Sequence, residues 1–335
     1  MLLPVGCVQR LLVLMGAENL RERASTRIEP ITRAWSRVVE GRIRPPDALE
    51  LIVADHCNIA CRQCNHASPA VSKWNLDPAD ALDQLSRLAT VYRPRRVKLI
   101  GGEPLLNPKL AEIVRAARAS GICEHITLVT NGILISRLSD EAWDLLDEIE
   151  ISRYPNANLN QRTIELAFDK GAHRGTAVVL NSFDTFRYTF TTVANSDAAQ
   201  VRKIFAACKI ATIWGCHALY KGSVYRCPQS IYVRSFAPGA PQEGIELADD
   251  DEFQARLLAF LNATEPLDAC RHCFGTCGAK IPHSLVARKA WRAGLDDVDP
   301  SEMVDLELLE RTQRWKPLSD DCKTEAARNA SRETT

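Results

Sequence analysis

The sequence has no excess of charge of either sign. Its 42 Lys and Arg residues balance 42 Asp and Glu residues, so the formal net charge is zero. A domain without a strong positive charge lacks the electrostatic footprint of a protein that binds nucleic acid or an anionic membrane. We therefore expect a small molecule as the partner, and neither nucleic acid nor a membrane.

The sequence also lacks a recognisable signal peptide and a long hydrophobic run. The apolar stretch Leu2–Met15 has no basic n-region and no small-residue cleavage site, and Gln9 and Arg10 interrupt it. There are 12 cysteines, but most are bunched rather than spread as in a disulfide framework. This bunched distribution of cysteines predicts a reducing, cytoplasmic location and favours metal binding.

From residue 48 onward, short apolar runs alternate with helical patterns. This alternation predicts α/β architecture with a parallel sheet that forms a closed or partial barrel. We expect strands at Leu49–Ala54, Val97–Ile100, Ile126–Val129, Ile149–Ser152, Ala177–Leu180 and Phe186–Thr192. Helices are expected at Pro78–Val91, Pro108–Ser120, Asp140–Leu146 and Asn160–Lys170.

The predicted organisation has four parts. Residues 1–46 form a helical arm with helices at Arg10–Arg23 and Ile28–Val39, ended by Gly41 and Pro45-Pro46. Residues 47–205 form the main α/β domain, and 206–290 form a small cysteine-rich domain. Residues 291–335 carry a helix around Met303–Arg314 and then a polar end that we expect to be mobile.

Three cysteines, Cys57, Cys61 and Cys64, follow the first predicted strand directly. A loop with this spacing can bring three thiolates round one [4Fe-4S] cluster and leave its fourth iron without a protein ligand. An open iron is a site for chemistry. The alternatives are a structural zinc site with His66 as fourth ligand, or a set of reduced thiols.

Polar motifs also follow the next three strands. They are Gly101-Gly102-Glu103-Pro104, Asn131-Gly132 and Ser152-Arg153-Tyr154-Pro155. In parallel barrels the loops at the C-terminal ends of the strands build the active site. An ordinary turn explains each motif taken singly, but not their recurrence at one end of the sheet.

A second group of cysteines lies in the predicted small domain: Cys208, Cys216, Cys227, Cys270, Cys273 and Cys277. Gly222 starts a hairpin turn that leads into Cys227, and Cys270 with Cys273 forms a knuckle that places two sulfurs on one metal. Four such ligands close a site. A structural zinc ribbon is the alternative to an iron–sulfur cluster here. Cys7 and Cys123 are predicted to be buried or incidental thiols.

Taken together, CxxxCxxC, Gly-Gly-Glu-Pro and Asn-Gly, in this order at successive strand ends, resemble the signatures of the radical S-adenosylmethionine (radical SAM) superfamily. The resemblance implies a partial (β/α)6 barrel over roughly residues 48–200, with the open cluster on Cys57, Cys61 and Cys64. It places the amino group of SAM at Gly101, Gly102 and Glu103. It also puts the ribose at Asn131 and Ser152, and the methionyl carboxylate at Arg153. One departure is Gln63, where the family usually has an aromatic residue.

The second cysteine group resembles the twitch domain, a shortened SPASM domain that carries an auxiliary Fe-S cluster. The spacing of Cys208, Gly222 and Cys227 fits the opening pattern of that domain, whereas Cys216 lies too close to Gly222. The resemblance therefore implies one auxiliary [4Fe-4S] cluster on Cys208, Cys227, Cys270 and Cys273, with Cys216 as the other option for the first position. If unligated, Cys216 or Cys277 is a candidate hydrogen-atom donor to a substrate radical.

The resemblance implies reductive cleavage of SAM to a 5′-deoxyadenosyl radical, with an electron donor such as flavodoxin or ferredoxin. A single-cluster twitch domain resembles enzymes that tailor sugars, aminocyclitols and nucleosides in antibiotic biosynthesis, such as the 2-deoxy-scyllo-inosamine dehydrogenase and cytosylglucuronate decarboxylase types. The outcome would be dehydrogenation, dehydration, decarboxylation or epimerisation, hence an oxidoreductase or a lyase. The alternatives are a peptide-modifying maturase and a non-catalytic zinc- or cluster-binding interaction protein. Candidate polar pocket residues are Asn181, Arg187, Tyr188, His217 and Arg226.

Overall fold

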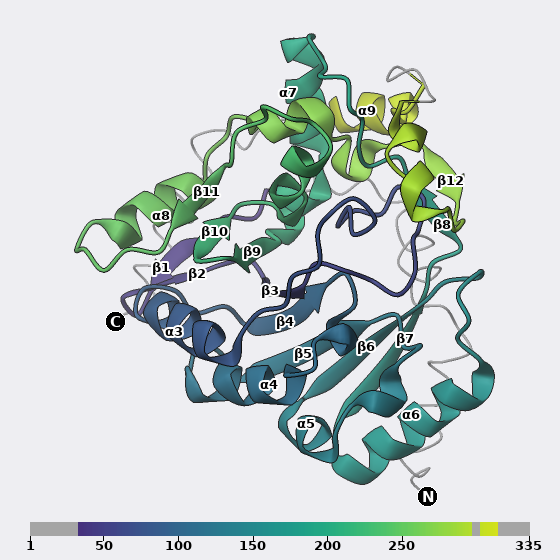
Figure 1. Ribbon diagram of the computed structural model, residues 1–335. Coiled ribbons are helices and arrows are strands. Elements are labelled where there is room, and N and C mark those ends of the chain that lie inside the picture. Colours follow the sequence, from purple (N-terminus) through teal and green to yellow (C-terminus); the bar gives the residue numbers. More distant parts are fainter. Residues whose placement is uncertain (1–32, 297–301, 314–335) are drawn as a thin grey trace, which may run out of the picture.

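The computed structural model describes residues 33–296 and 302–313 (Figure 1). The predicted helix Arg10–Arg23, Cys7, Cys322 and the polar end therefore lie outside the described residues. No helix among the described residues is long and apolar enough to cross a membrane.

The main sheet has eight strands in the order β11-β10-β9-β3-β4-β5-β6-β7. Five consecutive parallel strands form its centre: β3 (Ala48–Ala54), β4 (Arg96–Gly101), β5 (His125–Thr130), β6 (Glu148–Arg153) and β7 (Ala177–Ser182). The helices between them are α3 (Pro78–Ala89), α4 (Leu110–Ala119), α5 (Asp140–Leu145) and α6 (Gln161–Arg174). The predicted α/β class with a parallel sheet is confirmed.

The strand expected at Phe186–Thr192 is mostly wrong. Only its first two residues belong to a strand, β8 (Thr185–Arg187), which pairs antiparallel with β12 (Lys280–Pro282) in a separate sheet, and Phe190 forms an isolated bridge with Cys273. The sixth parallel strand is instead β9 (His217–Tyr220), which lies beside β3 at the opposite edge and is followed by antiparallel β10 (Ser223–Tyr225) and β11 (Gly244–Glu246). Phe186 packs on Tyr154 and His283 outside the main sheet, so its ring is half-buried without a place in the parallel sheet.

The predicted helix Ile28–Val39 is wrong over the residues that the structure describes. There, β1 (Arg37–Val39) and β2 (Arg42–Arg44) form a hairpin. Its turn residues Glu40 and Gly41 both have positive φ, 51° and 74°. Two residues with positive φ make the type I′ turn that suits a two-residue hairpin, so Gly41 marks a hairpin turn rather than a helix end.

Local signals explain where the central helices begin and end. Asp77 caps α3 by accepting a hydrogen bond from the Ala79 backbone N–H, and Pro78 occupies the first turn. Asn160 caps α6 in the same way through Thr163. The α6 helix continues past the predicted end at Lys170 because Gly175 supplies the left-handed C-terminal residue, with φ of 77°.

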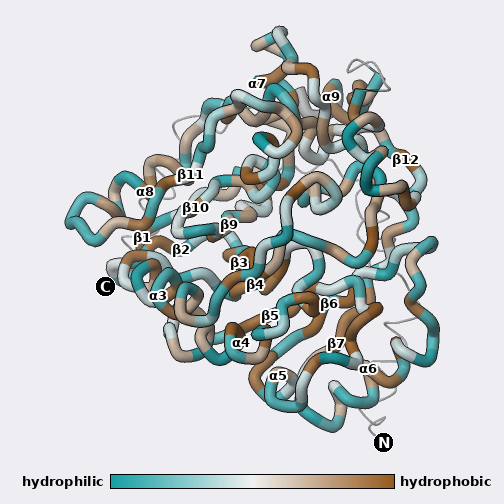
Figure 2. The backbone as a smooth tube through the Cα atoms, viewed as in Figure 1, coloured by the Kyte–Doolittle hydropathy of each residue, from teal (hydrophilic) through white to brown (hydrophobic). Residues whose placement is uncertain are grey.

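The helices cover one face of the sheet, as Figure 1 shows for α3, α4, α5 and α6. Alternate residues of β3, Leu49, Leu51 and Val53, are fully buried in the core against them. The hydrophobic stretches in Figure 2 are concentrated in the central strands. The main core therefore lies between the sheet and this layer of helices.

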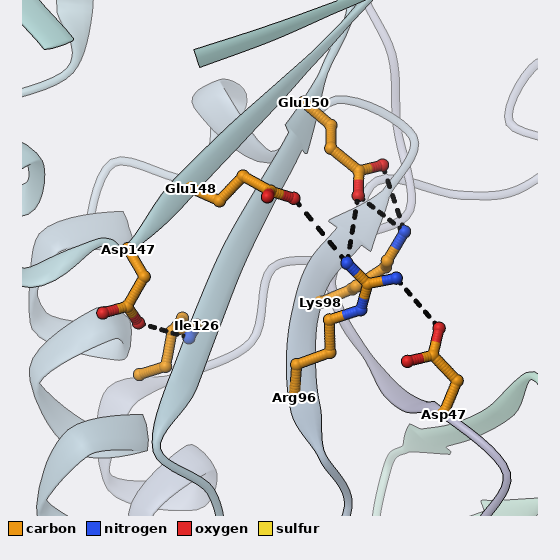
Figure 3. A network of polar contacts seen from close by, with 7 residues as sticks. All are labelled: Asp47, Arg96, Lys98, Ile126, Asp147, Glu148 and Glu150. Carbon is orange, nitrogen blue, oxygen red and sulfur yellow. Dashed lines mark hydrogen bonds and ion pairs between the residues drawn. The ribbon is translucent and has the colours of Figure 1, made fainter. Parts of the chain in front are cut away.

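The opposite face of the sheet is charged (Figure 3). Lys98 of β4 donates to both carboxylate oxygens of Glu150 on β6, at 2.8 and 3.0 Å. Arg96 lies 2.9 Å from Asp47 and 3.7 Å from Glu148. Burial raises the pKa of Glu50, on the same face of β3, to about 7 despite the nearby Lys98 ammonium. We call this polar surface of β3–β6 the inner face.

The helices that follow in the described part of the chain are α7 (Ala198–Ala207), α8 (Phe253–Leu261) and α9 (Leu306–Gln313). The buried side chains of α8 belong to the main core, whereas those of α7 and α9 include members of a separate small cluster. The helix expected around Met303–Arg314 begins only at Leu306, and Arg314 lies outside the described residues. Met303 precedes it as a fully buried side chain in a small cluster with Ile204, Phe274 and Cys277.

Candidate active site

The loop after β3 brings the three predicted cluster cysteines together. Cys61 is buried, and Cys57 and Cys64 are half-buried. Burial raises the pKa of Cys57 to about 12, and the negative charges of Glu103 and Cys64 add to the effect. Burial and the other two thiols likewise raise the pKa of Cys61. The three sulfurs therefore lie within electrostatic reach of one another.

This set of donors fits an iron–sulfur cluster. Buried thiols that repel one another as thiolates need a nearby cation to ionise, and cluster irons supply that charge. Backbone hydrogen bonds from Ser68 and His66 already favour the charged form of Cys64 and lower its pKa against the larger effect of burial. Across residues 33–296 and 302–313, no three His, Cys, Asp or Glu side chains converge on one metal-ion position. A cluster does not need such convergence, because each thiolate binds a different iron.

The structure shows a packing role for Gly101 and Gly102, and their predicted contact with the amino group of SAM remains a prediction. A Cβ on Gly101 would lie 2.1 Å from the Ala54 carbonyl oxygen, and one on Gly102 would lie 2.3 Å from that of His56. The backbone N–H of Gly102 donates to Ala54 at 2.7 Å. The glycines therefore let the second strand end pack directly on the start of the cysteine loop, rather than only leaving room for a ligand.

Glu103 is fully buried and already has protein partners. Its Oε1 accepts hydrogen bonds from the Thr130 hydroxyl at 2.6 Å and from the Leu105 backbone N–H at 3.0 Å. Its Oε2 accepts one from the Asn131 backbone N–H at 2.8 Å. A carboxylate has about four lone-pair positions, so roughly one remains for a ligand ammonium. Burial raises the pKa of Glu103, and the three donors oppose that rise.

Asn131 connects the third strand end to the cysteine loop. Its side-chain amide donates to the Asn58 side chain at 2.7 Å and lies 3.7 Å from the Cys57 sulfur. Its side-chain oxygen accepts from the Ile133 backbone N–H at 3.1 Å. The predicted contact with ribose remains a prediction, and in this structure Asn131 fixes the position of Cys57.

The two residues predicted from the fourth strand end do not share one side of the sheet. Ser152 is buried on the inner face, after Glu148 and Glu150. Arg153 is exposed and alternates onto the helix-covered face with Ile151. Only Ser152 therefore lies on the side where the sheet is polar.

Sequence reasoning missed Tyr154 as a neighbour of the cysteines. Burial is the main reason that its pKa is raised, and the charges of Cys61, Cys64 and Cys57 contribute. Its ring stacks on His283, with centroids 5.0 Å apart and planes 17° apart. The one signal in the sequence was its place within the predicted motif Ser152-Arg153-Tyr154-Pro155.

The side chain of Gln63, the residue that departs from the family pattern, makes contacts within the protein. Its side-chain oxygen accepts hydrogen bonds from the backbone N–H groups of Thr189 and Phe190, at 2.9 and 3.0 Å. Its own φ of 56° is in the left-handed region. Gln63 thus connects the cysteine loop to the segment that follows β8.

Residues 283–291 lie along the cysteine loop, which the sequence did not indicate. The Arg62 backbone N–H donates to Ser284 at 2.8 Å, and that of Val286 donates to Ala60 at 2.9 Å. The Trp291 indole N–H donates to the Cys61 carbonyl at 3.0 Å. Nε2 of His283 lies 3.3 Å from the Cys61 sulfur. We call this stretch the 283–291 segment.

The second cysteine group also comes together. Cys208, Cys270 and Cys273 are close enough that their charges add to burial in raising the pKa of Cys227. Cys208 has the same effect on Cys270, Cys273 and Cys277. The Gly275 backbone N–H donates to the Cys273 sulfur at 3.3 Å. The four cysteines predicted as auxiliary ligands are thus neighbours around Cys208, and their metal remains a prediction.

The two candidate hydrogen-atom donors lie in different places. Cys277 is fully buried and contacts the Ile204 carbonyl at 3.5 Å, next to the second cysteine group. Cys216 lies just before β9, where Glu50 and Cys227 are the leading charges that add to burial in raising its pKa. Cys216 therefore stands between the inner face and the second cysteine group.

Most of the predicted pocket residues are used within the protein. Arg226 donates to the carbonyls of Ala263 and Glu265 at 2.8 and 2.7 Å, and His217 pairs with the Tyr92 hydroxyl at 2.9 Å. Arg187 donates to the Gly278 carbonyl, and the Tyr188 hydroxyl accepts from Arg62. Asn181 lies beside Ser152 in the sheet, so it is the one member of this set that adjoins a predicted cofactor residue.

The part of the chain that carries the cysteine loop and the next strand ends matches a known family. Residues 51–161 match the model of the Radical SAM superfamily. This part of the chain is a radical SAM domain, which belongs to a family of enzymes that use a [4Fe-4S] cluster and SAM. The match contains the cysteine loop, the Gly-Gly-Glu-Pro turn and Asn131, and it indicates an enzyme rather than a non-catalytic binding protein.

Curated relatives match over the same region. A probable GTP 3′,8-cyclase of Metallosphaera sedula is 35% identical over 111 residues, which are 32% of this chain and 34% of the relative. The GTP 3′,8-cyclase of Chlorobaculum tepidum is 30% identical over 110 residues, 32% of this chain and 33% of the relative. The chain thus spans about a third of the length of these relatives.

Solved structures with a similar arrangement include BtrN in complex with AdoMet and 2-DOIA. It has a TM-score of 0.42 and 18% identity, and the alignment covers 68% of this chain and 92% of that one. Streptococcus suis SuiB has a TM-score of 0.33 and 11% identity, with 68% of each chain covered. Likeness at this level carries no information about the substrate.

We expect Gly102→Ala to destabilise the fold by about 1–3 kcal/mol, because the new methyl group meets backbone atoms of the cysteine loop rather than a mobile side chain. Chemical denaturation followed by circular dichroism measures the change. Gly294→Ala is the matched control, since nothing lies within 4 Å of its Cβ position. Equal stability of the two variants would contradict the close packing described here.

Proposed function

We propose that this protein is a radical SAM enzyme that cleaves SAM reductively and abstracts hydrogen from a small, polar, carbohydrate-type substrate. The observation that supports SAM cleavage is the group of three cysteines, one buried and two half-buried, at the C-terminal end of β3, tied to the next two strand ends through Glu103 and Asn131. When bound there, a [4Fe-4S] cluster with SAM supplies the reductive generation of a carbon-centred radical. The protein's part is to orient these groups and exclude water.

The inner face supports a polar substrate. Glu150 precedes Ser152 by two residues on the same side of β6, which corresponds to roughly 7 Å along a strand. The Lys98–Glu150 pair is thus about one small molecule's length from the strand ends that carry the site. Charged side chains at that depth suit hydroxyl and amino groups better than an apolar ligand.

The curated relatives do not extend this proposal to GTP. Their similarity covers about a third of each chain and coincides with the radical SAM domain, where the cofactor rather than the substrate is expected to bind. The second cysteine group and the 283–291 segment, which complete this site, lie outside residues 51–161. The proposed substrate class is therefore inferred from the residues of the inner face of this chain and not from its relatives.

Cys216 is the better placed of the two candidate hydrogen-atom donors. It adjoins Glu50 and Lys98 of the inner face, whereas Cys277 is buried behind the second cysteine group. Burial raises the pKa of Cys216 well above its usual value, so its sulfur keeps its proton. A neutral thiol is the form that can donate a hydrogen atom.

The second cysteine group would hold an auxiliary [4Fe-4S] cluster on Cys208, Cys227, Cys270 and Cys273. Its support is that these four sulfurs are mutual neighbours. Located behind Cys216, such a cluster could accept an electron from a substrate radical, which would give dehydrogenation. An external donor such as flavodoxin or ferredoxin would reduce the first cluster.

We expect Cys61→Ala to abolish production of 5′-deoxyadenosine from SAM and dithionite in anaerobically reconstituted protein, because one of three cluster thiolates is lost. Product is measured by liquid chromatography. Cys123→Ala is the control, since this buried cysteine contacts the His125 carbonyl away from both cysteine groups. Cleavage retained by Cys61→Ala would rule out the assigned cluster site.

We expect Cys270→Ala to lose a large share of the bound iron and sulfide while the signal of the first cluster persists in electron paramagnetic resonance (EPR) spectra. Metal and sulfide analysis before and after reconstitution measures the change. Loss of zinc with unchanged iron would show that the second group is a zinc site instead.

We expect sugars, aminocyclitols or nucleosides, but not short peptides, to stimulate 5′-deoxyadenosine formation. Lys98→Met should raise the KM for the stimulating compound by roughly tenfold or more while leaving substrate-free SAM cleavage intact, because it removes one cation from the inner face. Lys109→Met is the control, since Lys109 pairs with Asp77 on the exposed side of the helices. Stimulation by peptides alone would favour a peptide-modifying enzyme.

A further inference from the structure

The 283–291 segment contacts the cysteine loop along most of its length. Backbone hydrogen bonds join it to Ala60 and Arg62 on both sides of Cys61, and Cys61 itself forms a β-bridge with Leu285. Arg288 donates to the carbonyls of Ser68, at 3.2 Å, and Cys57. With the indole of Trp291 on the Cys61 carbonyl, the segment fixes the backbone around the central cysteine of the trio.

His283 begins this segment and is the one side chain in it that reaches a cysteine sulfur among the described residues. Its Nε2 lies 3.3 Å from the Cys61 sulfur, and its ring is 4% exposed. The ring is held between Tyr154, which stacks on it, and Phe186, whose centroid is 4.8 Å away at an angle of 68°. These contacts leave the imidazole little freedom to turn away from the sulfur.

The chemistry of the pair fixes the direction of this hydrogen bond. A cysteine sulfur that binds iron is a thiolate and has no proton to donate. The contact is therefore a hydrogen bond only if Nε2 carries the proton and donates it. Nδ1 is then the acceptor nitrogen, and it is buried without a hydrogen-bond partner among the described residues.

We propose that His283 is a positioning residue that sets the reduction potential of the first cluster by donating a hydrogen bond from Nε2 to the sulfur of Cys61. Reduction adds negative charge to a cluster and its sulfurs, and a donor at the sulfur stabilises that charge. Hydrogen bonds to the sulfurs are among the factors that set cluster potentials. His283 thereby favours the reduced cluster that SAM cleavage requires.

This inference rests on the proposed function, since it needs a cluster on Cys61. It adds to that function a residue that lies far from the radical SAM signatures in sequence. His283 comes six positions after Cys277, on the far side of β12. The same short stretch of chain therefore carries ligands of the second cysteine group and the donor to the first.

The test is a potentiometric titration of the reconstituted full-length protein, followed by EPR of the reduced cluster signal that changes when SAM is added. His283→Phe keeps a ring for the stack on Tyr154 but removes the donor. At a fixed potential, we expect the ratio of reduced to oxidised cluster to fall roughly tenfold, which equals about 59 mV for a one-electron couple. His283→Gln retains an N–H donor and should recover part of the shift.

Ser284→Ala is the matched control, because Ser284 contributes its backbone carbonyl to Arg62 and should leave the potential unchanged. Pulsed EPR of protein labelled with ¹⁵N only in the histidine rings tests the contact directly, and a ¹⁵N coupling to the reduced cluster is expected in the wild type and not in His283→Phe. Absence of that coupling, or a potential in His283→Phe equal to that of the wild type, would overturn the role of His283 and leave the cluster assignment intact. A wild-type protein that assembles no cluster would overturn both.

Discussion

The buried carboxylate of Glu103 is the contact on which the geometry of the site depends. It joins two segments, because it accepts hydrogen bonds from its own turn and from two consecutive residues at the end of β5, the Thr130 hydroxyl and the Asn131 backbone N–H. Asn131 in turn holds Asn58, next to Cys57. A buried carboxylate left with fewer donors would pay the full cost of desolvation, so each partner is held in place by the others. The ends of consecutive strands and the cysteine loop thus form one hydrogen-bonded unit before any cofactor is considered.

The sheet beneath this unit has two chemically different faces. Leu49, Leu51 and Val53 alternate with Glu50 and Ile52 along β3, and the same alternation continues in β4 and β6. The apolar face binds the layer of helices and supplies most of the main core, so most of the hydrophobic stabilisation of the sheet comes from this face. The inner face is therefore free to carry ion pairs such as Lys98 with Glu150, which would weaken a core but suit a polar ligand.

Much of the domain could be predicted from local patterns in the sequence. Short apolar runs, Asp77 as a helix cap and the polar motifs at successive strand ends all act within a few residues, so the central strands and helices are where the sequence placed them. The prediction of a strand at Phe186–Thr192 was mostly wrong because an apolar run indicates that a segment is buried but not which strand it pairs with. Here the pairing strand is β12, almost a hundred residues later in the chain. The contacts of Tyr154, Gln63 and His283 were missed for the same reason, since each joins residues that are distant in sequence.

The long-range contacts that the sequence concealed are concentrated between the two cysteine groups. Gln63 binds the backbone after β8, β8 pairs with β12, and β12 leads directly into the 283–291 segment on the cysteine loop. These contacts connect the two cysteine groups through backbone and side-chain hydrogen bonds. The cysteine loop therefore packs directly on the C-terminal part of the chain, although every signature of the radical SAM domain lies before residue 162. The contacts that position the site thus extend well beyond the family motifs.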